Sequence, residues 1–345
     1  MFEVPVVFVV GAGASSEYGL PLGGALKDSI AEKLEFRFEY GGSRLIGGDA
    51  DLLADIDRHV GGDREKRYEY TEAARMLAAT ARSFISIDEA LHYLGATPKA
   101  VEIGKVAIVR EILEAERNSI LSYDKGTGRL VVGAKDGWIG QVMSMAVAGI
   151  QREELNRAFD TVTFVNFNYD RAIEQYLYWA LQQRMLASAN EARQMIERLK
   201  MIRPYGSIGP LKFNSVDVDA YGTSAYFDPF ARIGNLRTYT EEAHLHDANA
   251  LEQALLGARL VIFLGFGYHP TNVDLLKVLQ ATSHPRRILG TSKGLHGANI
   301  QTISSRIADN LKLTNSITLF DMEATALLRE LRQQILIQLG QGHPP

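Results

Sequence analysis

The sequence predicts an α/β protein built on a mostly parallel sheet with an inserted helical subdomain. An unbroken apolar run, 6–10, leads directly into a glycine-rich turn, 11–15, which is typical of a buried parallel strand in an open α/β sheet. Three later apolar runs end in small, polar or glycine residues and precede helical patterns; they are 161–165, 259–264 and 287–289. Their carboxyl ends are expected at one edge of the sheet, where such folds bind ligands. This combination is Rossmann-like.

Helical patterns fill most of the interval between the first two strands. Apolar residues recur at helical spacing in four stretches, 22–38, 67–84, 98–120 and 139–159. A series of helices between two strands of one sheet predicts an inserted subdomain.

The rest of the chain contains a loop-like part and a closing helix. Residues 206–240 are rich in aromatic, Gly, Asn and Asp residues and lack a helix period, which favours a loop over the cleft. Residues 323–339 carry leucine and isoleucine at helical spacing, which predicts one amphipathic helix. The expected division is a core of 1–22 and 160–322, a mainly helical insertion of 23–159, and a C-terminal helix and tail of 323–345.

The composition excludes several classes of protein. The 345 residues are 46% hydrophobic and 23% charged, as in ordinary globular proteins. The formal net charge of −4 gives no general attraction to nucleic acid, so direct nucleic-acid binding is not expected. No signal peptide precedes Val6, and no apolar run approaches the roughly 20 residues of a membrane span. We therefore expect a cytoplasmic location and no membrane partner.

Metal chemistry is not expected from this sequence. The absence of cysteine excludes disulfides, thiolate nucleophiles and cysteine-bound zinc. His244 and His246 have acidic neighbours but no fixed metal-binding spacing, so we interpret them as part of a polar surface.

The turn 11–15 predicts a nucleotide site. Gly11 and Gly13 would let the backbone approach a pyrophosphate closely, and the following helix would direct free N–H groups at the anion. The usual dinucleotide fingerprint has a third glycine, which Ser16 replaces here. A tight turn without a ligand is the alternative interpretation.

Short motifs at the strand ends occur in a fixed order. They are Gly11-Ala12-Gly13-Ala14-Ser15 with Gly19-Leu20-Pro21, then Asn168-Tyr169-Asp170, Gly265-Phe266-Gly267 and Gly290-Thr291-Ser292. Their order resembles the sirtuin-like superfamily, specifically the bacterial sirtuin-like NAD-consuming domains of antiphage systems. The resemblance implies that NAD is bound by Gly11, Ala12, Gly13, Ser15, Pro21, Asn168, Gly265, Phe266, Gly267, Thr291 and Ser292.

Two departures from the family limit the reactions that we expect of this protein. Family deacetylases carry zinc on four cysteines and an Asp-Phe-Arg sequence after Gly-Leu-Pro, whereas this chain has no cysteine and continues Leu22-Gly23-Gly24. Protein deacylation is therefore disfavoured. Tyr205 also stands where most family members have a catalytic histidine before glycine, and a tyrosine, with an ordinary pKa of about 10, is a poor general base at neutral pH.

The resemblance implies cleavage of NAD at the nicotinamide–ribose bond, with Asn168, Asp170 and Tyr205 as catalytic candidates. The leaving group is a neutral pyridine and positive charge develops on the ribose, so an enzyme mainly positions the ribose, supports the cation and admits water. Asn168 would hold a ribose hydroxyl or the attacking water; capping the next helix is its alternative role. Asp170 would orient Asn168 or bind the ribose or the nicotinamide amide, and it fits a capping role equally well.

Other candidate side chains also have two interpretations. Tyr205 would bind the ribose or stack on nicotinamide, or else be a buried tyrosine with a satisfied hydroxyl. Ser15 would bind phosphate or cap the first helix. His92 and His269 would replace the missing base, although a lone histidine is more often structural.

The leading hypothesis is an NAD glycohydrolase that releases nicotinamide and ADP-ribose as an antiphage defence effector. The resemblance also implies homo-oligomers, regulation by assembly and, in some systems, a partner ATPase of the HerA type. The alternative is a catalytically weak or inactive subunit that binds NAD or ADP-ribose as a sensor or assembly component of a defence complex.

Overall fold

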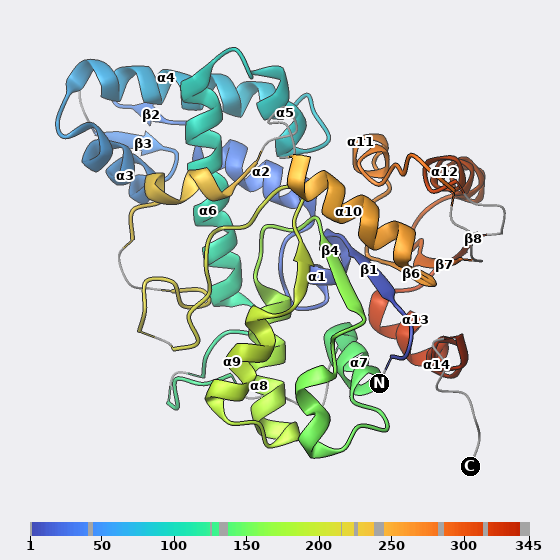
Figure 1. Ribbon diagram of the computed structural model, residues 1–345. Helices are drawn as coiled ribbons and strands as arrows, with labels where there is room; N and C mark the ends of the chain where they lie inside the picture. Colours follow the sequence, from blue (N-terminus) through green and yellow to red (C-terminus); the bar gives the residue numbers. More distant parts are fainter. Residues whose placement is uncertain are drawn as a thin grey trace.

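A six-stranded parallel sheet lies at the centre of the computed structural model (Figure 1). Its strands, in spatial order, are β5 (Lys200–Ile202), β4 (Val162–Asn166), β1 (Val6–Val10), β6 (Leu260–Leu264), β7 (Arg287–Thr291) and β8 (Ile317–Phe320). Numbered along the chain, this order is 3-2-1-4-5-6, the arrangement of doubly wound Rossmann-like sheets. The predicted α/β class is therefore confirmed.

The structure describes most of the chain. The described residues are 2–40, 44–124, 126–130, 137–214, 216–223, 227–237, 245–281, 286–312 and 317–338, without the side chains of 245–247 and 338. The polar group around His244 and His246 lies outside them. None of the helices in these ranges combines the length and the apolar character of a membrane span.

The central strand β1 is fully buried because its side chains alternate between two cores. Val7 and Val9 belong to the core on one face, and Val6, Phe8 and Val10 to the core on the other.

The two cores are closed by different helices. The first contains side chains of α2 (Gly23–Lys33), α3 (Ala50–Val60), α4 (Arg64–Ala81), α5 (Ile87–Tyr93), α6 (Pro98–Asn118), α10 (Leu245–Gly257), α11 (Pro270–Asp274) and α12 (Gly297–Asn310). The second contains side chains of α1 (Ala12–Ser16), α7 (Gly137–Ala146), α8 (Ala172–Met185), α9 (Ala189–Glu197), α13 (Ala324–Glu330) and α14 (Arg332–Gln338). Two 3₁₀ helices, η1 (Arg152–Arg157) and η2 (Phe230–Asn235), complete the helices of the described ranges.

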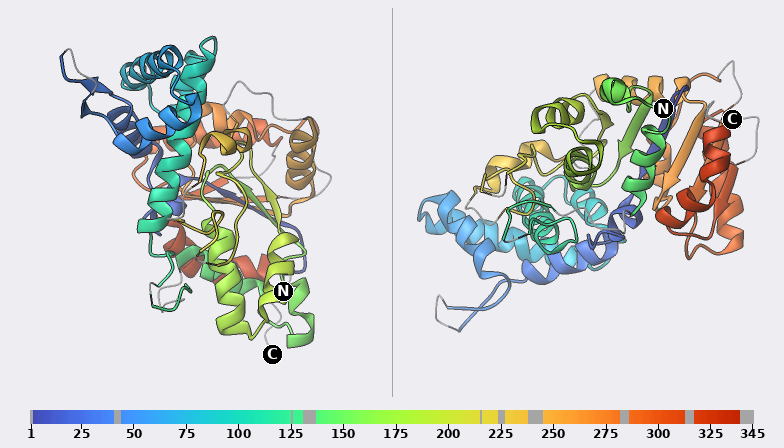
Figure 2. Two further views of the ribbon diagram at one scale, coloured as in Figure 1. Left: turned by 90° about the vertical axis from the view of Figure 1, so that its left-hand side faces the viewer. Right: turned by 90° about the horizontal axis from the view of Figure 1, so that it is seen from below.

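Helices α2 to α6 form a lobe at one side of the sheet, together with a small antiparallel pair, β2 (Arg37–Phe38) and β3 (Leu45–Gly47) (Figures 1 and 2). Capping side chains start three of its helices. Asp49 accepts from the N–H of Leu52, Asp63 from those of Glu65 and Lys66, and Ser86 from that of Glu89. Ser86 thereby fixes the start of α5, which carries part of the candidate site.

Several predicted helices have different limits. The predicted helix 139–159 ends as α7 at Ala146, followed by Gly149 at a φ of 75°, which favours glycine and interrupts a helix. The predicted helix 22–38 ends at Lys33, because the chain then turns into β2. The predicted helix 323–339 is divided between α13 and α14 at Leu331, where no Gly or Pro marks a break.

The segment after β5, predicted as a loop, is anchored by a buried ion pair. Arg171 donates to both oxygens of Glu116 on α6, and it also donates to the carbonyls of Pro210, Asp219 and Ala220. Both charged side chains are almost completely buried. Because every donor direction is used, this pair fixes the segment between the helical lobe and the sheet.

Candidate functional site

A cavity of about 760 Å³ lies at the carboxyl ends of β1, β4 and β6, within the range of about 300 to 1,000 Å³ found for small-molecule sites. The register places Val10, Asn166 and Leu264 side by side, so the three strands end at the same level. The opposite wall comes from residues 84–89 and from His92 and Tyr93, mostly on α5. We call this space the Asn168 cavity.

The predicted site residues divide into those that line the cavity and those that support it. The lining includes Gly11, Ala12, Pro21, Asn168, Asp170, Tyr205, Phe266 and Gly267. It does not include Gly13, Ser15, Gly265, Thr291 or Ser292.

The glycines after β1 and β6 allow two backbone turns to pack together. A Cβ on Gly13 would lie 2.9 Å from the Gly265 carbonyl oxygen, and a Cβ on Gly11 would lie 2.7 Å from the same atom. Gly265 itself has a φ of +55°, and a Cβ there would lie 1.9 Å from the Ala14 nitrogen. Close packing at the β1–β6 crevice is thus a reason for Gly13 that the sequence alone did not reveal.

Thr291 supports this crevice from the end of β7. Its hydroxyl accepts a hydrogen bond from the Gly265 N–H at 2.8 Å, and its carbonyl accepts one from Tyr268 at 2.9 Å. The neighbouring Ser292 is buried, and its hydroxyl has no hydrogen-bond partner among the described residues.

Ser15 links Asn168 to Asp170. The Asn168 Nδ2 donates to the Ser15 Oγ at 2.8 Å, and the Ser15 hydroxyl bonds in turn to the Asp170 carboxylate. Asp170 also accepts from the Ala172 N–H at the start of α8. It therefore has both roles that the sequence left open, orienting Asn168 and capping a helix.

Burial raises the pKa of the Asp170 carboxyl above its ordinary value. Complete burial raises its pKa from 3.8 to about 6, against the opposing effects of hydrogen bonds from Ala172 and Ser15 and of the Arg203 charge. The group is mostly ionised at pH 7 and holds a proton below about pH 6, so the polar network at Asn168 changes in mildly acidic solution.

Arg203 holds the backbone of the Asn168 motif. Its Nη1 donates to the carbonyls of Asn168 at 3.0 Å and Asp170 at 2.9 Å, and its Nη2 donates to Glu174 at 2.7 Å. Three bonds from one guanidinium fix the direction in which Asn168 enters the cavity.

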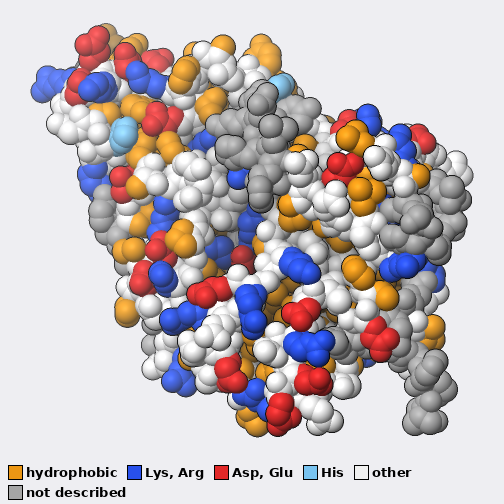
Figure 3. Space-filling view, in the orientation of Figure 1, with side chains coloured by type: hydrophobic (Ala, Val, Ile, Leu, Met, Phe, Trp, Pro, Cys, Tyr) orange, Lys and Arg blue, Asp and Glu red, His pale blue; other side chains and the backbone are white. Residues whose placement is uncertain are grey.

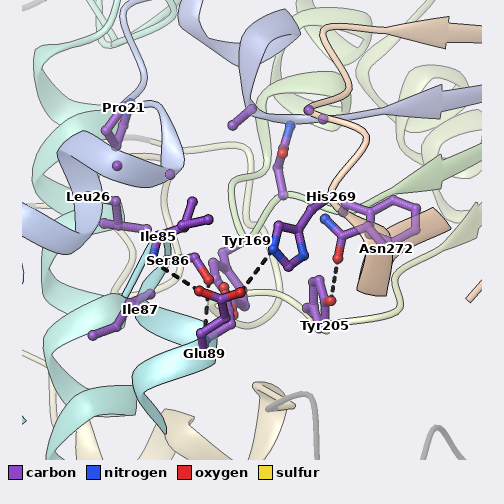
Figure 4. Close-up of a pocket in the computed structure, with 18 of the residues that line it drawn as sticks. Pro21, Leu26, Ile85, Ser86, Ile87, Glu89, Tyr169, Tyr205, His269 and Asn272 are labelled. Atoms are coloured by element: carbon purple, nitrogen blue, oxygen red, sulfur yellow. Dashed lines mark hydrogen bonds and ion pairs between the residues drawn. The ribbon is translucent and has the colours of Figure 1, made fainter. Parts of the chain in front are cut away.

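Tyr205 forms an aromatic wall of the cavity. Its ring is buried, contacts Phe167 edge-on with centroids 5.9 Å apart, and its hydroxyl donates to the Asn272 Oδ1 at 2.5 Å (Figure 4). Because this hydroxyl is a donor to an amide oxygen, the geometry suits positioning or stacking better than proton abstraction.

A histidine–carboxylate pair faces the same space. The His269 Nε2 lies 2.9 Å from the Glu89 Oε1, and Glu89 also caps the backbone N–H of Ile85 (Figure 4). The adjacent Asp88 is hydrogen-bonded to the Tyr169 hydroxyl, and burial raises the pKa of its carboxyl. The other candidate histidine, His92, lines the cavity as well.

The carboxylates of Asp88 and Glu89 are functional candidates that the sequence analysis missed. Both lie in the first turn of α5, where acidic residues are expected for helix stability alone. Only tertiary packing brings α5 opposite the loop after β6, so no local pattern pairs Glu89 with His269.

The charged side chains that line the cavity are mainly acidic. Among the described residues, its lining contains the carboxylates of Asp88, Glu89 and Asp170 and no Lys or Arg. Such a site favours a ligand with a positively charged or hydroxyl-rich end over one that presents only phosphates there.

The described residues contain no group of three or more His, Asp or Glu side chains able to hold a metal ion. Comparison of the chain with protein-family models and with curated proteins finds no match.

Proposed function

We propose that the protein is a sirtuin-like NAD glycohydrolase that cleaves NAD to nicotinamide and ADP-ribose, and that it acts in antiphage defence. The observation that carries the proposal is the convergence of Asn168, the His269–Glu89 pair and the carboxylates of Asp88 and Asp170 on a cavity whose described lining contains no Lys or Arg, beside the glycine-rich turn at Gly11. The turn at Gly11 and Ala12 lines the cavity, and turns of this kind at strand ends receive phosphates in such folds, so we assign the pyrophosphate to this turn. The N–H groups of Gly11 and Gly13 are bonded to the carbonyls of Leu264 and Gly265 and take no part in it. The acidic cavity suits the nicotinamide ribose, because the pyridinium and the oxocarbenium ion formed from it are both cationic.

The proposed reaction divides the tasks among the residues. The bond between C1′ and the nicotinamide nitrogen breaks with its electron pair leaving on nicotinamide, while Asp88, Glu89 and Asp170 stabilise the positive ribose through their charges. Asn168 holds a ribose hydroxyl or the attacking water, and Tyr205 packs against the ring. The bond to Glu89 favours the His269 tautomer protonated at Nε2, which leaves Nδ1 free to accept a proton from water as its oxygen bonds C1′.

The alternative function, an inactive sensor or assembly subunit that binds NAD or ADP-ribose, is favoured by the Tyr205 hydroxyl being a donor to Asn272. Both functions need the same cavity but differ in whether NAD is consumed. Assembly into homo-oligomers and association with a HerA-type ATPase belong to the proposal through the family resemblance alone.

Filling the cavity at Gly267 is expected to abolish binding of ADP-ribose. A Cβ at Gly267 would meet no atom within 4 Å, so Gly267→Leu should fold while its side chain occupies space in the cavity. Isothermal titration with ADP-ribose should show at least about a tenfold loss of affinity. Gly257→Leu is the matched control, because Gly257 ends α10 outside the cavity lining and is equally unhindered. Equal affinities of the two folded variants would place the nucleotide elsewhere.

A further inference from the structure

A second cavity, of about 760 Å³, lies on the other side of the Tyr205 loop. Its walls come from the start of α8, from α9 and β5, and from the segments 206–214 and 234–237. Tyr205 lines the Asn168 cavity, whereas Gly206 and Ser207 line the second one. The proposed reaction uses no residue that faces only this second space, which we call the Arg193 cavity.

Positive charge dominates the Arg193 cavity. Arg193, Lys212 and Arg237 line it. Over α8, α9 and the neighbouring loops, Figure 3 shows Lys and Arg side chains interspersed with Asp and Glu, so the positive excess belongs to the cavity lining. Among the described residues, neither Arg193 nor Lys212 has a hydrogen-bond or ion-pair partner for its side chain. Cations without partners at a concave surface are suited to a phosphate group.

Two arginines of the cavity lining are each paired with a glutamate. Arg171 is paired with Glu116, and Arg203 is paired with Glu174. The excess positive charge therefore lies at the walls, on the side chains that a ligand can reach.

An aromatic surface and neutral polar groups complete the lining. Phe213 is stacked on Tyr178 with ring centroids 3.9 Å apart and an interplanar angle of 12°, so the ring is held in place while remaining only half-buried. Ser207 and Asn235 add a hydroxyl and an amide, and Glu197 adds a carboxylate that can accept from a hydroxyl. A ligand that matches all of these groups has an anionic end, sugar hydroxyls and a flat base.

We propose that the Arg193 cavity binds a nucleoside monophosphate, with the phosphate at Arg193 and Lys212 and the base on Phe213. Inorganic phosphate and an acidic peptide fit less well, because neither of them supplies a flat base that stacks on Phe213. The site is distinct from the Asn168 cavity and does not depend on NAD cleavage.

Titration with AMP tests the proposal. The full-length Gly267→Leu protein is titrated beside the wild type, because this substitution suppresses binding in the Asn168 cavity. AMP should bind both proteins, and the double variant Arg193→Glu, Lys212→Glu should lose at least about tenfold in affinity in either background. Arg198→Glu is the matched control, because Arg198 follows the same helix and is exposed outside the cavity.

The variant Phe213→Leu distinguishes the contribution of the base to binding from that of the phosphate. It should weaken binding of AMP several-fold and leave binding of ribose 5-phosphate unchanged, while the melting temperature checks that the variant is folded. Absence of AMP binding, or AMP binding that survives the double charge reversal, would overturn the proposal. Equal effects of Phe213→Leu on AMP and ribose 5-phosphate would overturn the assignment of the base.

Discussion

Replacing Asn168 by alanine is expected to lower the rate of NAD cleavage by about a hundredfold or more, the scale found when one hydrogen-bonding group that stabilises a transition state is removed. The side chain lines the cavity and is oriented by Ser15 and by the three bonds of Arg203 to its surroundings. Because those contacts fix its direction before substrate binds, its contribution should appear in kcat more than in KM.

The companion variant Ser15→Ala distinguishes the contact of Asn168 with the substrate from the orientation of its side chain by Ser15. It removes the oxygen to which the Asn168 amide donates but leaves Asn168 in place, so its loss of activity should be smaller than that of Asn168→Ala. Melting temperatures of both variants check the fold. Near-normal turnover by folded Asn168→Ala would move the active site elsewhere.

Replacing His269 by glutamine is expected to lower the rate by about a hundredfold, as loss of a general base does at the lower end of its usual range. Tyr205→Phe should by contrast keep most of the activity, because the ring remains and its hydroxyl is a donor to Asn272 rather than a base. Tyr205→Ala should lose most of it through loss of the cavity wall. Rates of nicotinamide release measure all three.

An exposed histidine supplies the control for the His269 variant. His296 precedes α12 outside the cavity lining, and His296→Gln should cleave NAD at the wild-type rate. The opposite ranking, with Tyr205→Phe more damaged than His269→Gln, would assign the base to Tyr205 and contradict the role given to the His269–Glu89 pair.

The long buried strands could be predicted from the sequence, whereas the short edge strands could not. β1 has the predicted limits, β4 is shifted by one residue at both ends, and β6 begins one residue later than predicted. These strands are apolar runs because both faces of the sheet are covered. β5 has three residues and none is fully buried, and the four residues of β8 are all half-buried. Neither of them was predicted as a strand from the sequence.

The candidate site was predictable where it follows strand ends. Asn168, Asp170, Tyr205 and the turn at Gly11 were expected at one edge of the sheet, and they line one cavity. The wall formed by α5 was not predictable, because its position depends on how the helical lobe packs against the sheet. The supporting role of Thr291 could not be predicted either. Its hydroxyl accepts a hydrogen bond from the Gly265 N–H, but a threonine that binds a ligand at a strand end would have the same neighbours in the sequence.

Product analysis of NAD incubated with the purified protein, alone and with the protein encoded beside it, distinguishes NAD cleavage from NAD binding. We expect nicotinamide and ADP-ribose in equal amounts, at a rate proportional to protein concentration and strongly reduced by Asn168→Ala. The contrary result is a wild-type protein that binds NAD or ADP-ribose and yet releases no nicotinamide under either condition. Gain of NAD cleavage on Tyr205→His in that protein would then identify it as a nucleotide-binding subunit that lacks its base.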